Sequence, residues 1–364
     1  MNYKFGGFGH CGKDGFMVKF MYKHKWSLSA LAAAFLLFCF YKAGIIWFPH
    51  GLYQWVCLPC MRALQHISDC VEFSLTEWVI GAFVLSVAVM IIFFVCKAVR
   101  HKSLAFIADM AFVLCAAAIA VYSGYCLLWG VTYYQPSLRQ NAGIERREHS
   151  IQQLYELTCQ YALACNESRT EIDKQAAMDV NAAILAPLAD EFGLAVDTEY
   201  SVKPLVFSKA VSYMGFTGFY FPFTGECNVN TDIPAVSLPA TAVHELAHRA
   251  GAAAEDEANL MAILVCTQSG NKDFVYSGNM MAFSYLHSAL YSNDKELWEQ
   301  AIGLLDREVA LDIVARGEYW EQFESPIEDA WSATYDQFLQ SFDQKDGIAT
   351  YDNVVGLLLD MEYN

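Results

Sequence analysis

The chain has 364 residues, of which 55% are hydrophobic and 17% charged, a composition too apolar for an ordinary soluble enzyme and typical of a membrane protein. Its net charge of −17 is unevenly distributed. Residues 1–131 contain ten Lys or Arg against five Asp or Glu, whereas residues 132–364 contain thirteen against thirty-five. The acidic distal part argues against nucleic acid as a partner, because phosphate binding requires a basic surface.

A basic N-terminal tail, residues 1–26, precedes three long apolar runs. Each run has about 20 residues, which is enough to cross a hydrocarbon core of about 30 Å. The loop between the second and third runs is basic, so the positive-inside rule places this loop and the N-terminus in the cytoplasm. Residues 132 onward then lie outside the cell membrane, and the lipid bilayer is an expected partner. The three runs are Leu28–Phe48, Trp78–Cys96 and Met110–Val131.

The part of the chain after the third run predicts a linker and one α-rich domain. Residues 132–150 contain Pro136 and a charged stretch and are expected to form the linker, and residues 151–364 the domain. Ile151–Asn166 has helical periodicity, and Lys174–Leu194 is expected to form another helix. Residues 203–238 are richer in Val, Phe, Tyr, Gly and Pro and predict short strands. We therefore expect a mainly α membrane protein, with a three-helix anchor over residues 27–131 and a small β element before residue 240.

A C-x-x-C pair, Cys57-Leu-Pro-Cys60, falls in the expected external loop between the first two spans. No β-α-β pattern of the thioredoxin type surrounds it. We therefore interpret the pair as a possible local disulfide.

The chemistry is concentrated in an H-E-x-x-H sequence, His244-Glu-Leu-Ala-His248. On a helix the two histidines lie one turn apart on the same face, so both imidazoles can reach one Zn²⁺ ion. Glu245 is rotated around the helix and can serve as the base that accepts a proton from a water held at the metal. Pro239 suits the first turn of this helix, and Gly251 can end it in the left-handed conformation. The alternative interpretation is that the pattern arose by chance on a surface helix.

An acidic helix start follows within a few residues and offers the third ligand. Glu255, Asp256 and Glu257 open a second, mostly apolar helix, where carboxylates suit the positive end of the helix dipole. We expect Glu255 to be the third ligand and keep Glu257 as the second choice. Asn259 lies one turn after Glu255 and can hydrogen-bond a ligand from behind.

Two further features of the sequence could serve a hydrolytic cleft. The segment Gly218–Asn230 could form a strand that pairs with an extended peptide, or an ordinary hairpin packed against the metal helix. Tyr285 and His287, in the aromatic stripe Tyr276–Tyr291, are candidates for stabilising an oxyanion. A stripe of this kind is more often part of a core than of a site.

The layout from about residue 26 to the end resembles the domain-of-unknown-function family 3810 of bacterial membrane proteins. The resemblance implies a three-span anchor that carries a zincin-like domain, and it supplies no substrate. Glu255-x-x-x-Asn259 is also similar to the pattern of gluzincin peptidases, which implies Glu255 as the third ligand, although the gap after His248 is short for that class. The matching stretches are Trp129–Tyr133, Phe219–Glu226, His244–Gly251, Glu255–Asn259 and Gly347–Leu359.

The sequence therefore predicts a membrane-anchored zinc metallopeptidase that hydrolyses extracytoplasmic peptides or proteins. His244, His248 and Glu255 are its expected Zn²⁺ ligands, and Glu245 is its expected base. One alternative is a membrane sensor or peptide-binding protein that keeps the zincin shape without turnover. Another is a structural envelope protein without metal.

Overall fold

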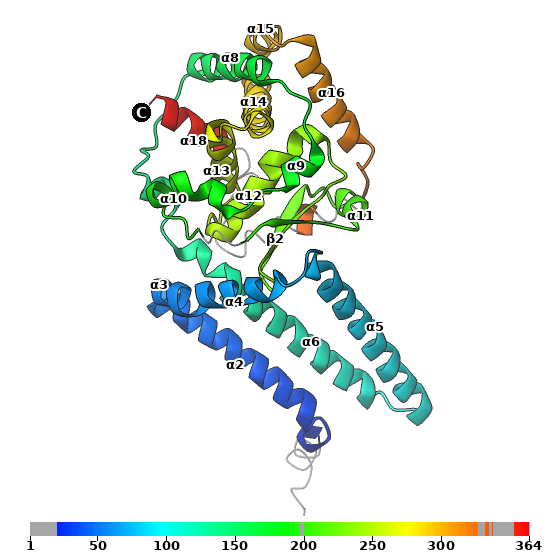
Figure 1. Cartoon of the computed structure of the whole chain (residues 1–364). Helices are drawn as coiled ribbons and strands as arrows, with labels where there is room; N and C mark the ends of the chain where they lie inside the picture. The colour runs from blue at the N-terminus through cyan, green and yellow to red at the C-terminus, as the bar shows by residue number, and fades with distance from the viewer. Residues whose placement is uncertain (1–19, 197–199, 327–331, 335–336, 338–352, 364) are drawn as a thin grey trace, which may run out of the picture. The chain divides into compact units, whose positions relative to one another are not determined.

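The protein folds into two compact units. The computed structural model describes residues 20–196, 200–326, 332–334, 337 and 353–363. One unit comprises Met1–Pro49 and Ile80–Leu127, and the other comprises His50–Val79 and Leu128–Asn364. Helices dominate both units, and the second also contains a small sheet (Figure 1).

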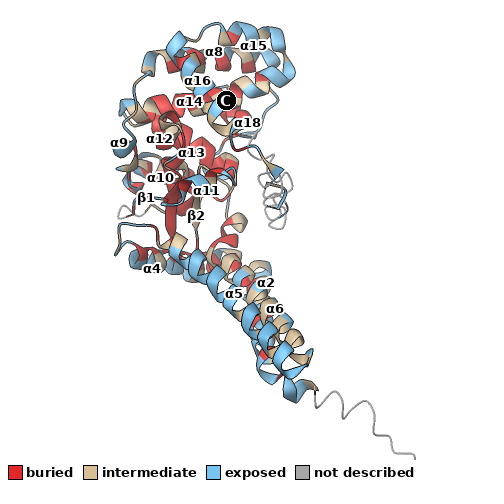
Figure 2. Ribbon diagram, turned by 90° about the vertical axis from the view of Figure 1, so that its right-hand side faces the viewer, coloured by how far each residue is buried: buried red, intermediate tan, exposed pale blue. Residues whose placement is uncertain are grey.

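The three predicted apolar runs form three helices, each long and apolar enough to cross a membrane. They are α2 (Lys25–Trp47), α5 (Leu75–His101) and α6 (Ala105–Tyr125), which continues through the π-helical turn η2 (Cys126–Gly130). Helix α2 packs against α6. At the start of α2, His24 Nδ1 lies 2.5 Å from Asp109 Oδ1 of α6, and Ser27 donates to the same oxygen at 2.9 Å. Much of the apolar surface of these helices is exposed, as expected of helices that face lipid (Figure 2).

The segment between the first two spans is helical, although the sequence had suggested a loop. It forms α3 (Pro49–Leu52), the π-helical turn η1 (Tyr53–Cys57) and α4 (Leu58–Ser68), all within the second unit. Helix α4 is amphipathic, with buried residues repeating at helical spacing. The suggested disulfide between Cys57 and Cys60 is wrong, because both thiols are free. Cys57 is buried in the core, whereas Cys60 is exposed.

Most of the second unit is a helical assembly around three buried helices. These are α12 (Leu238–Ala250), α13 (Glu255–Gln268) and α14 (Lys272–Asn293), which pack against one another and carry much of the core (Figure 2). The predicted helix Ile151–Asn166 is confirmed as α8, which packs on α14. The remaining elements are η3 (Thr132–Tyr134), α7 (Leu138–Asn141), α8 (Ile151–Ser168), α9 (Lys174–Met178), η4 (Ala182–Leu185), α10 (Ala186–Phe192), α11 (Ser208–Ser212), η5 (Ala235–Ser237), α15 (Lys295–Ile302), α16 (Arg307–Glu321) and α18 (Asn353–Glu362).

The single helix expected over Lys174–Leu194 is wrong, because this stretch forms three short pieces, α9, η4 and α10. Asn181 caps η4 through a hydrogen bond from Ala183 N–H to its side-chain oxygen at 2.9 Å. Its backbone also bridges to Ser201. An Asn that finds such local partners competes with continued helix.

The predicted β element is a three-stranded sheet immediately before α12. Strands β1 (Val202–Pro204), β2 (Gly218–Phe221) and β3 (Glu226–Val229) lie in the order β1-β3-β2. The β1–β3 pair is parallel and the β2–β3 pair antiparallel, with Tyr220 opposite Cys227. Strand β2 is therefore an edge strand, and all three strands contact α12.

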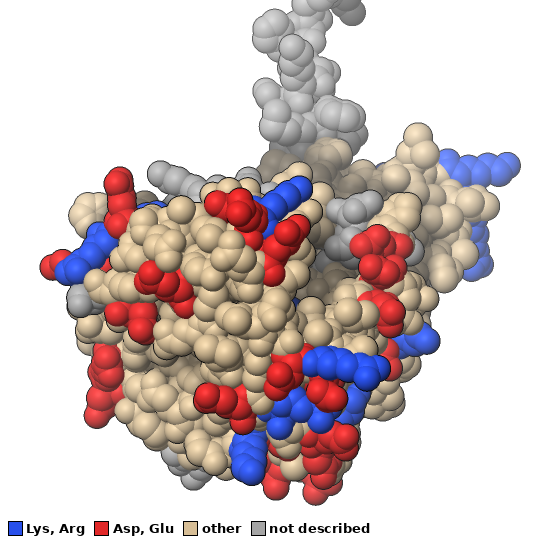
Figure 3. All heavy atoms as spheres, turned by 90° about the horizontal axis from the view of Figure 1, so that it is seen from above, with Lys and Arg blue, Asp and Glu red and all other residues tan. Residues whose placement is uncertain are grey.

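The surface of the second unit carries its excess of acidic residues. Figure 3 shows Asp and Glu side chains spread over the visible face, with fewer Lys and Arg among them. The region expected as a linker is held against this unit at its far end by the C-terminal helix. The buried Asp360 of α18 accepts hydrogen bonds from Arg139 Nη2 at 2.5 Å and from Arg147 N–H at 2.9 Å.

Candidate metal centre

The end of helix α12 sets up the site by reversing the chain. Gly251 takes a left-handed conformation with φ 115°, which favours glycine, and its N–H donates to His248 O at 2.9 Å. Ala252 N–H closes the turn on Ala247 O at 3.0 Å. Helix α13 then begins at Glu255, with its first three residues acidic. The turn returns the carboxylate of Glu255 to the face of α12 that carries the two histidines.

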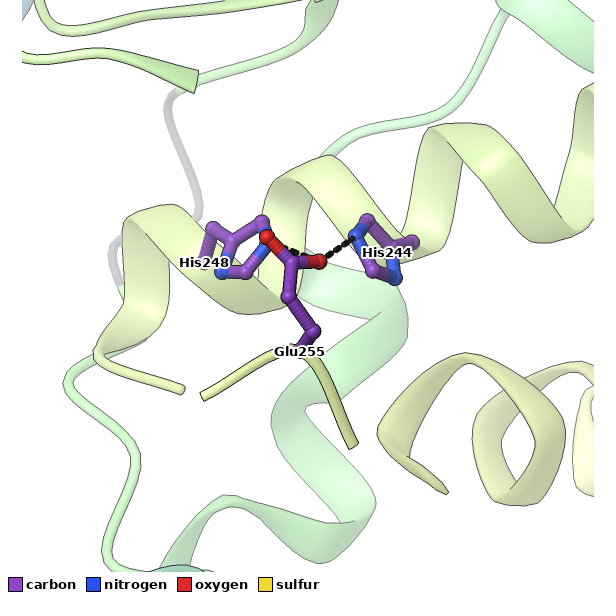
Figure 4. Close-up of side chains that lie close together, drawn as sticks. All are labelled: His244, His248 and Glu255. Atoms are coloured by element: carbon purple, nitrogen blue, oxygen red, sulfur yellow. Dashed lines mark ion pairs between the residues drawn. The ribbon is translucent and has the colours of Figure 1, made fainter. Parts of the chain in front are cut away.

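His244, His248 and Glu255 converge on one point from the two helices (Figure 4). Glu255 Oε2 lies 3.2 Å from His244 Nε2 and 3.4 Å from His248 Nε2. The three ligand atoms all fall within 4.8 Å of one another. Zinc bonds of about 2.0–2.1 Å at tetrahedral angles require ligand atoms about 3.3 Å apart. The two distances to Glu255 thus match the edges of a zinc tetrahedron.

The hydrogen bond between His248 and Ala252 determines which nitrogen of the His248 ring carries the proton and which one faces Glu255 as an acceptor. Its Nδ1 lies 2.7 Å from the backbone oxygen of Ala252, so Nδ1 carries the proton and donates it. A neutral His248 therefore presents the bare Nε2 to a carboxylate oxygen. Two acceptors that face each other need a cation between them, which is either a proton or a metal ion. A backbone carbonyl behind a ligating histidine is the usual arrangement at metal sites.

The electrostatics of the buried cluster indicate the same demand for positive charge. Burial favours neutral His248, but the Glu255 carboxylate overrides this effect and raises the pKa of His248 to about 9. Burial also opposes ionisation of Glu255, yet His248 and His244 hold the pKa of Glu255 well below its usual value. Burial and the neighbouring His248 lower the pKa of His244. The cluster thus combines an ionised carboxylate with two imidazoles, and the carboxylate favours the charged form of His248.

Glu245, the expected base, is buried on α12 beside the sheet. Its Oε2 has no hydrogen-bond partner among the described residues, and its carboxylate accepts a hydrogen bond from the backbone N–H of Tyr220. Burial raises the pKa of Glu245 to about 8. Gly218 leaves room for it, because a Cβ at Gly218 would lie 2.7 Å from Glu245 Oε1. A carboxyl group with a pKa near neutrality and a free oxygen is suited to proton transfer.

The free edge of strand β2 lies next to this carboxylate. Asn230 N–H donates to Thr217 O at 2.9 Å, which makes these two residues a hydrogen-bonded pair. The alternation of an antiparallel ladder then directs the backbone groups of Gly218 and Tyr220 away from β3. The Tyr220 N–H on this outer edge is the group that meets Glu245.

The other predicted residues of the second helix take different positions. Glu257 accepts a hydrogen bond from Leu138 N–H at 2.6 Å, so its carboxylate caps α7 and does not join the three ligand residues. Asn259 is buried beside His244, where its amide favours the charged imidazole. Asn259 Nδ2 has no hydrogen-bond partner among the described residues.

The two oxyanion candidates, both on α14, lie among other helices. His287 stacks on Phe283 at a ring distance of 5.0 Å and lies 3.4 Å from Trp298 Nε1 of α15. Burial and the nearby Arg316 lower its pKa to about 4. Tyr285 packs against the core and also lies near Arg316. The described contacts of His287 are thus with α14, α15 and Arg316, whereas Tyr285 packs against the core cluster that α12 and α13 share with α14.

Sequence reasoning missed two aromatic residues at the site. Trp129 packs edge-on against His248 at a ring distance of 5.9 Å and against Tyr220 at 5.0 Å. It precedes His248 by more than one hundred residues and ends the third apolar run, where an interfacial tryptophan is the ordinary expectation. No spacing rule links such a residue to a metal ligand.

Comparison with known families assigns the chain as a whole. Residues 48–359 match the family described as a protein of unknown function, DUF3810. The chain belongs to this family. No curated protein and no solved structure matches the chain. The DUF3810 assignment confirms the resemblance seen in the sequence and leaves the activity to be argued from the site.

Proposed function

We propose that this DUF3810 protein is a membrane-anchored zinc metallopeptidase. The observation that carries the proposal is the convergence of His244, His248 and Glu255 at distances that suit tetrahedral zinc. Three protein ligands that leave a fourth position open are typical of catalytic zinc sites, whereas structural sites are closed by four. A buried Glu245 with an unpartnered oxygen beside the ligands favours an enzyme over a retired site.

Different residues of the site would have different roles in hydrolysis. Bound Zn²⁺ would supply Lewis acidity, which brings the pKa of a water near 7 and polarises a substrate carbonyl. Glu245 takes the proton from the attacking water and returns it to the leaving amine, which breaks the C–N bond. Ala252 O orients the imidazole of His248 from behind, and Asn259 lies beside His244.

The outer edge of β2 is the proposed binding strand for an extended substrate. Its outward backbone groups at Gly218 and Tyr220 are adjacent to Glu245. A peptide that pairs with this edge places a backbone carbonyl next to the base, and main-chain hydrogen bonds supply affinity with little demand on sequence. The alternative offered by the sequence, an ordinary hairpin packed on the metal helix, describes the β2–β3 pair itself, in which β2 is the outer strand.

The direct test is the variant Glu245→Gln in the full-length protein, loaded with zinc and incubated with a peptide library. We expect it to retain zinc and to lose cleavage about 10²- to 10⁴-fold, the usual contribution of a general base. Glu318→Gln on the exposed surface of α16 is the matched control and should cleave normally. Equal cleavage by Glu245→Gln would overturn the mechanism. A zinc-loaded wild type that binds peptides without cutting them would favour the sensor alternative.

A further inference from the structure

The metal centre is one side chain away from the end of a candidate membrane span. The third span covers Ala105–Gly130, so Trp129 lies in its last turn. The Trp129 ring packs edge-on against His248, at a distance of 5.9 Å between ring centroids. The end of a membrane span lies where the hydrocarbon core meets the headgroup region of the bilayer. The ligand that Trp129 touches is therefore close to that level.

The first turn of the second span is attached to the sheet that supports the site. Glu226 of β3 accepts hydrogen bonds from the N–H groups of Leu75 at 3.0 Å and Thr76 at 2.7 Å. The buried Lys203 of β1 lies 2.8 Å from the same carboxylate and donates to the backbone oxygen of Ser68 at 2.6 Å. These contacts fix the start of α5 against β1 and β3.

The same turn positions two exposed apolar residues. The carboxylate of Glu77 accepts hydrogen bonds from Val206 N–H at 2.9 Å and Phe207 N–H at 2.7 Å. Val206 and Phe207 are 74% and 67% exposed, and Trp78, which opens the predicted apolar run, is 70% exposed. We call Trp78, Val206 and Phe207 the apolar rim. Trp78 begins a membrane span, so its side chain faces the bilayer. The same bilayer is the partner that fits the neighbouring exposed side chains of Val206 and Phe207.

The segment between the first two spans also touches the site. Gly225, in the β2–β3 turn, packs so closely on α4 that a Cβ there would lie 2.8 Å from the backbone nitrogen of Gln65. The side-chain oxygen of Gln65 accepts a hydrogen bond from the buried Arg249, the residue after His248. Both ends of α4 connect to spans through short stretches, so the substrate edge β2 and the metal helix α12 rest on a helix close to the bilayer.

We propose that the metal centre works at the bilayer surface, with Val206 and Phe207 inserted in the headgroup region, and that it acts on polypeptide segments held at this surface. The choice of substrate rests on the proposed peptidase function, whereas the lipid contact does not. A chain that is tethered to the membrane by a lipid or a span presents its juxtamembrane residues at this height. A freely soluble peptide reaches the metal centre only by diffusion from the bulk.

Photo-crosslinking in nanodiscs tests the lipid contact without any activity. Phe207→p-benzoyl-phenylalanine in the full-length protein should yield phospholipid adducts on irradiation, read by mass spectrometry. The same replacement at Leu163, which is 48% exposed on α8, is the control and should yield none. Equal lipid adducts at both positions, or adducts at Phe207 to protein in place of lipid, would overturn the inserted rim. Unchanged thermal unfolding of both variants shows that they are folded.

A matched pair of peptides tests the substrate class. A peptide that the zinc-loaded protein cleaves is compared with the same peptide carrying an N-terminal palmitoyl chain, both at equal total concentration with protein in nanodiscs. We expect the palmitoylated form to be cleaved at least tenfold faster, and Val206→Ser with Phe207→Ser to remove this preference. Equal rates for the two peptides would overturn the substrate class and leave the peptidase intact. If the zinc-loaded protein cleaved no peptide of the library, with or without a palmitoyl chain, the peptidase proposal would be overturned and the crosslinking result would still stand.

Discussion

His248 shows why the proposed metal site favours a cation. Its Nδ1–H is held by Ala252 O, so its Nε2 has only a lone pair to offer the Glu255 oxygen 3.4 Å away. In the absence of metal a proton has to occupy that gap, which agrees with a His248 pKa of about 9. At the proposed site zinc would therefore compete with a proton for the same position, and we expect metal binding to release that proton.

Gly218 gives the sharpest prediction for a single residue. A methyl group at Gly218 would lie 2.7 Å from Glu245 Oε1 and 2.8 Å from Asn228 O. We expect Gly218→Ala to displace the base and to lower peptide cleavage at least tenfold while zinc content is unchanged. Kinetic and metal analysis of the same sample measure both quantities.

Gly317→Ala is the matched control for this glycine. Gly317 lies within α16, and a Cβ there would meet nothing within 4 Å. Alanine is the better helix former by about 1 kcal/mol, so this variant should be as active and as stable as the wild type or slightly more stable. If Gly218→Ala cleaved peptides at the wild-type rate, this result would contradict the claim that Glu245 acts as the base in the position that Gly218 leaves open.

The sequence was sufficient to identify the proposed ligand residues but not the residues that pack around them. His244, His248 and Glu255 are recognisable because one-turn spacing and a following acidic helix start are local patterns. The contacts of Trp129 and Tyr220 come from distant parts of the chain, and only tertiary packing brings them to His248 and Glu245. Tyr285 and His287 show the opposite limit, that a local pattern can suggest a site without deciding it. The aromatic stripe on α14 is equally compatible with packing on neighbouring helices.

At the scale of elements, the C-terminal helix α18 anchors the stretch that follows the third span. Asp360 is 1% exposed and receives Arg139 Nη2, Arg147 N–H and His149 Nε2 at 2.5 to 2.9 Å. Glu257 of α13 holds the same stretch through Leu138 N–H. The anchoring of residues 138–149 therefore depends on two buried carboxylates from different helices.

Removing the Asp360 charge should loosen this contact. Asp360→Asn leaves Arg139 without its partner, and we expect a loss of about 3 kcal/mol in the free energy of unfolding, as for other broken buried pairs. Glu145→Gln is the control, because Glu145 is 75% exposed and 3.5 Å from Arg147, and such surface pairs contribute about 0–1 kcal/mol. Thermal unfolding of the full-length protein in nanodiscs compares the two. Equal stability of both variants would contradict the anchoring role.

The same carboxylate predicts how stability depends on pH. Burial opposes its ionisation, but the hydrogen bonds from His149 and Arg139 hold the pKa of Asp360 below its ordinary value. A depressed folded pKa stabilises the fold above the unfolded value of about 3.9, and this contribution is lost as pH falls through the folded value. The wild type should therefore approach the stability of Asp360→Asn below about pH 4. A difference between them that stays constant down to pH 2 would contradict this linkage.

Elements with a strong pattern were predictable, and those decided by tertiary contacts were not. The three spans and the helix Ile151–Asn166 follow from long apolar runs or clear periodicity. Helix α4 was missed because it lies in a short stretch between two spans and buries only one face on the second unit. The break at Asn181 depends on a bridge to Ser201 that no local pattern reveals.

At the scale of the whole chain, the orientation in the membrane follows from charge. Residues 1–131 carry a positive balance in the N-terminal tail and the loop around Lys97–Lys102, and the second unit is strongly acidic. We expect the N-terminus in the cytoplasm and the metal-binding unit outside. In a bacterial host, alkaline phosphatase fused after Asn364 should be active, and green fluorescent protein fused before Met1 should fluoresce. The reverse pattern would contradict the orientation.

The measurement that decides most is the zinc content of the purified protein, determined by inductively coupled plasma mass spectrometry after loading and dialysis. We expect about one zinc ion per wild-type chain and per Glu318→Gln chain. His248→Ala and Glu255→Ala should each lose most of the metal, because each removes one of three ligands that meet at Glu255 Oε2. A wild type that retains no zinc, or ligand variants that retain as much as the wild type, would contradict the account.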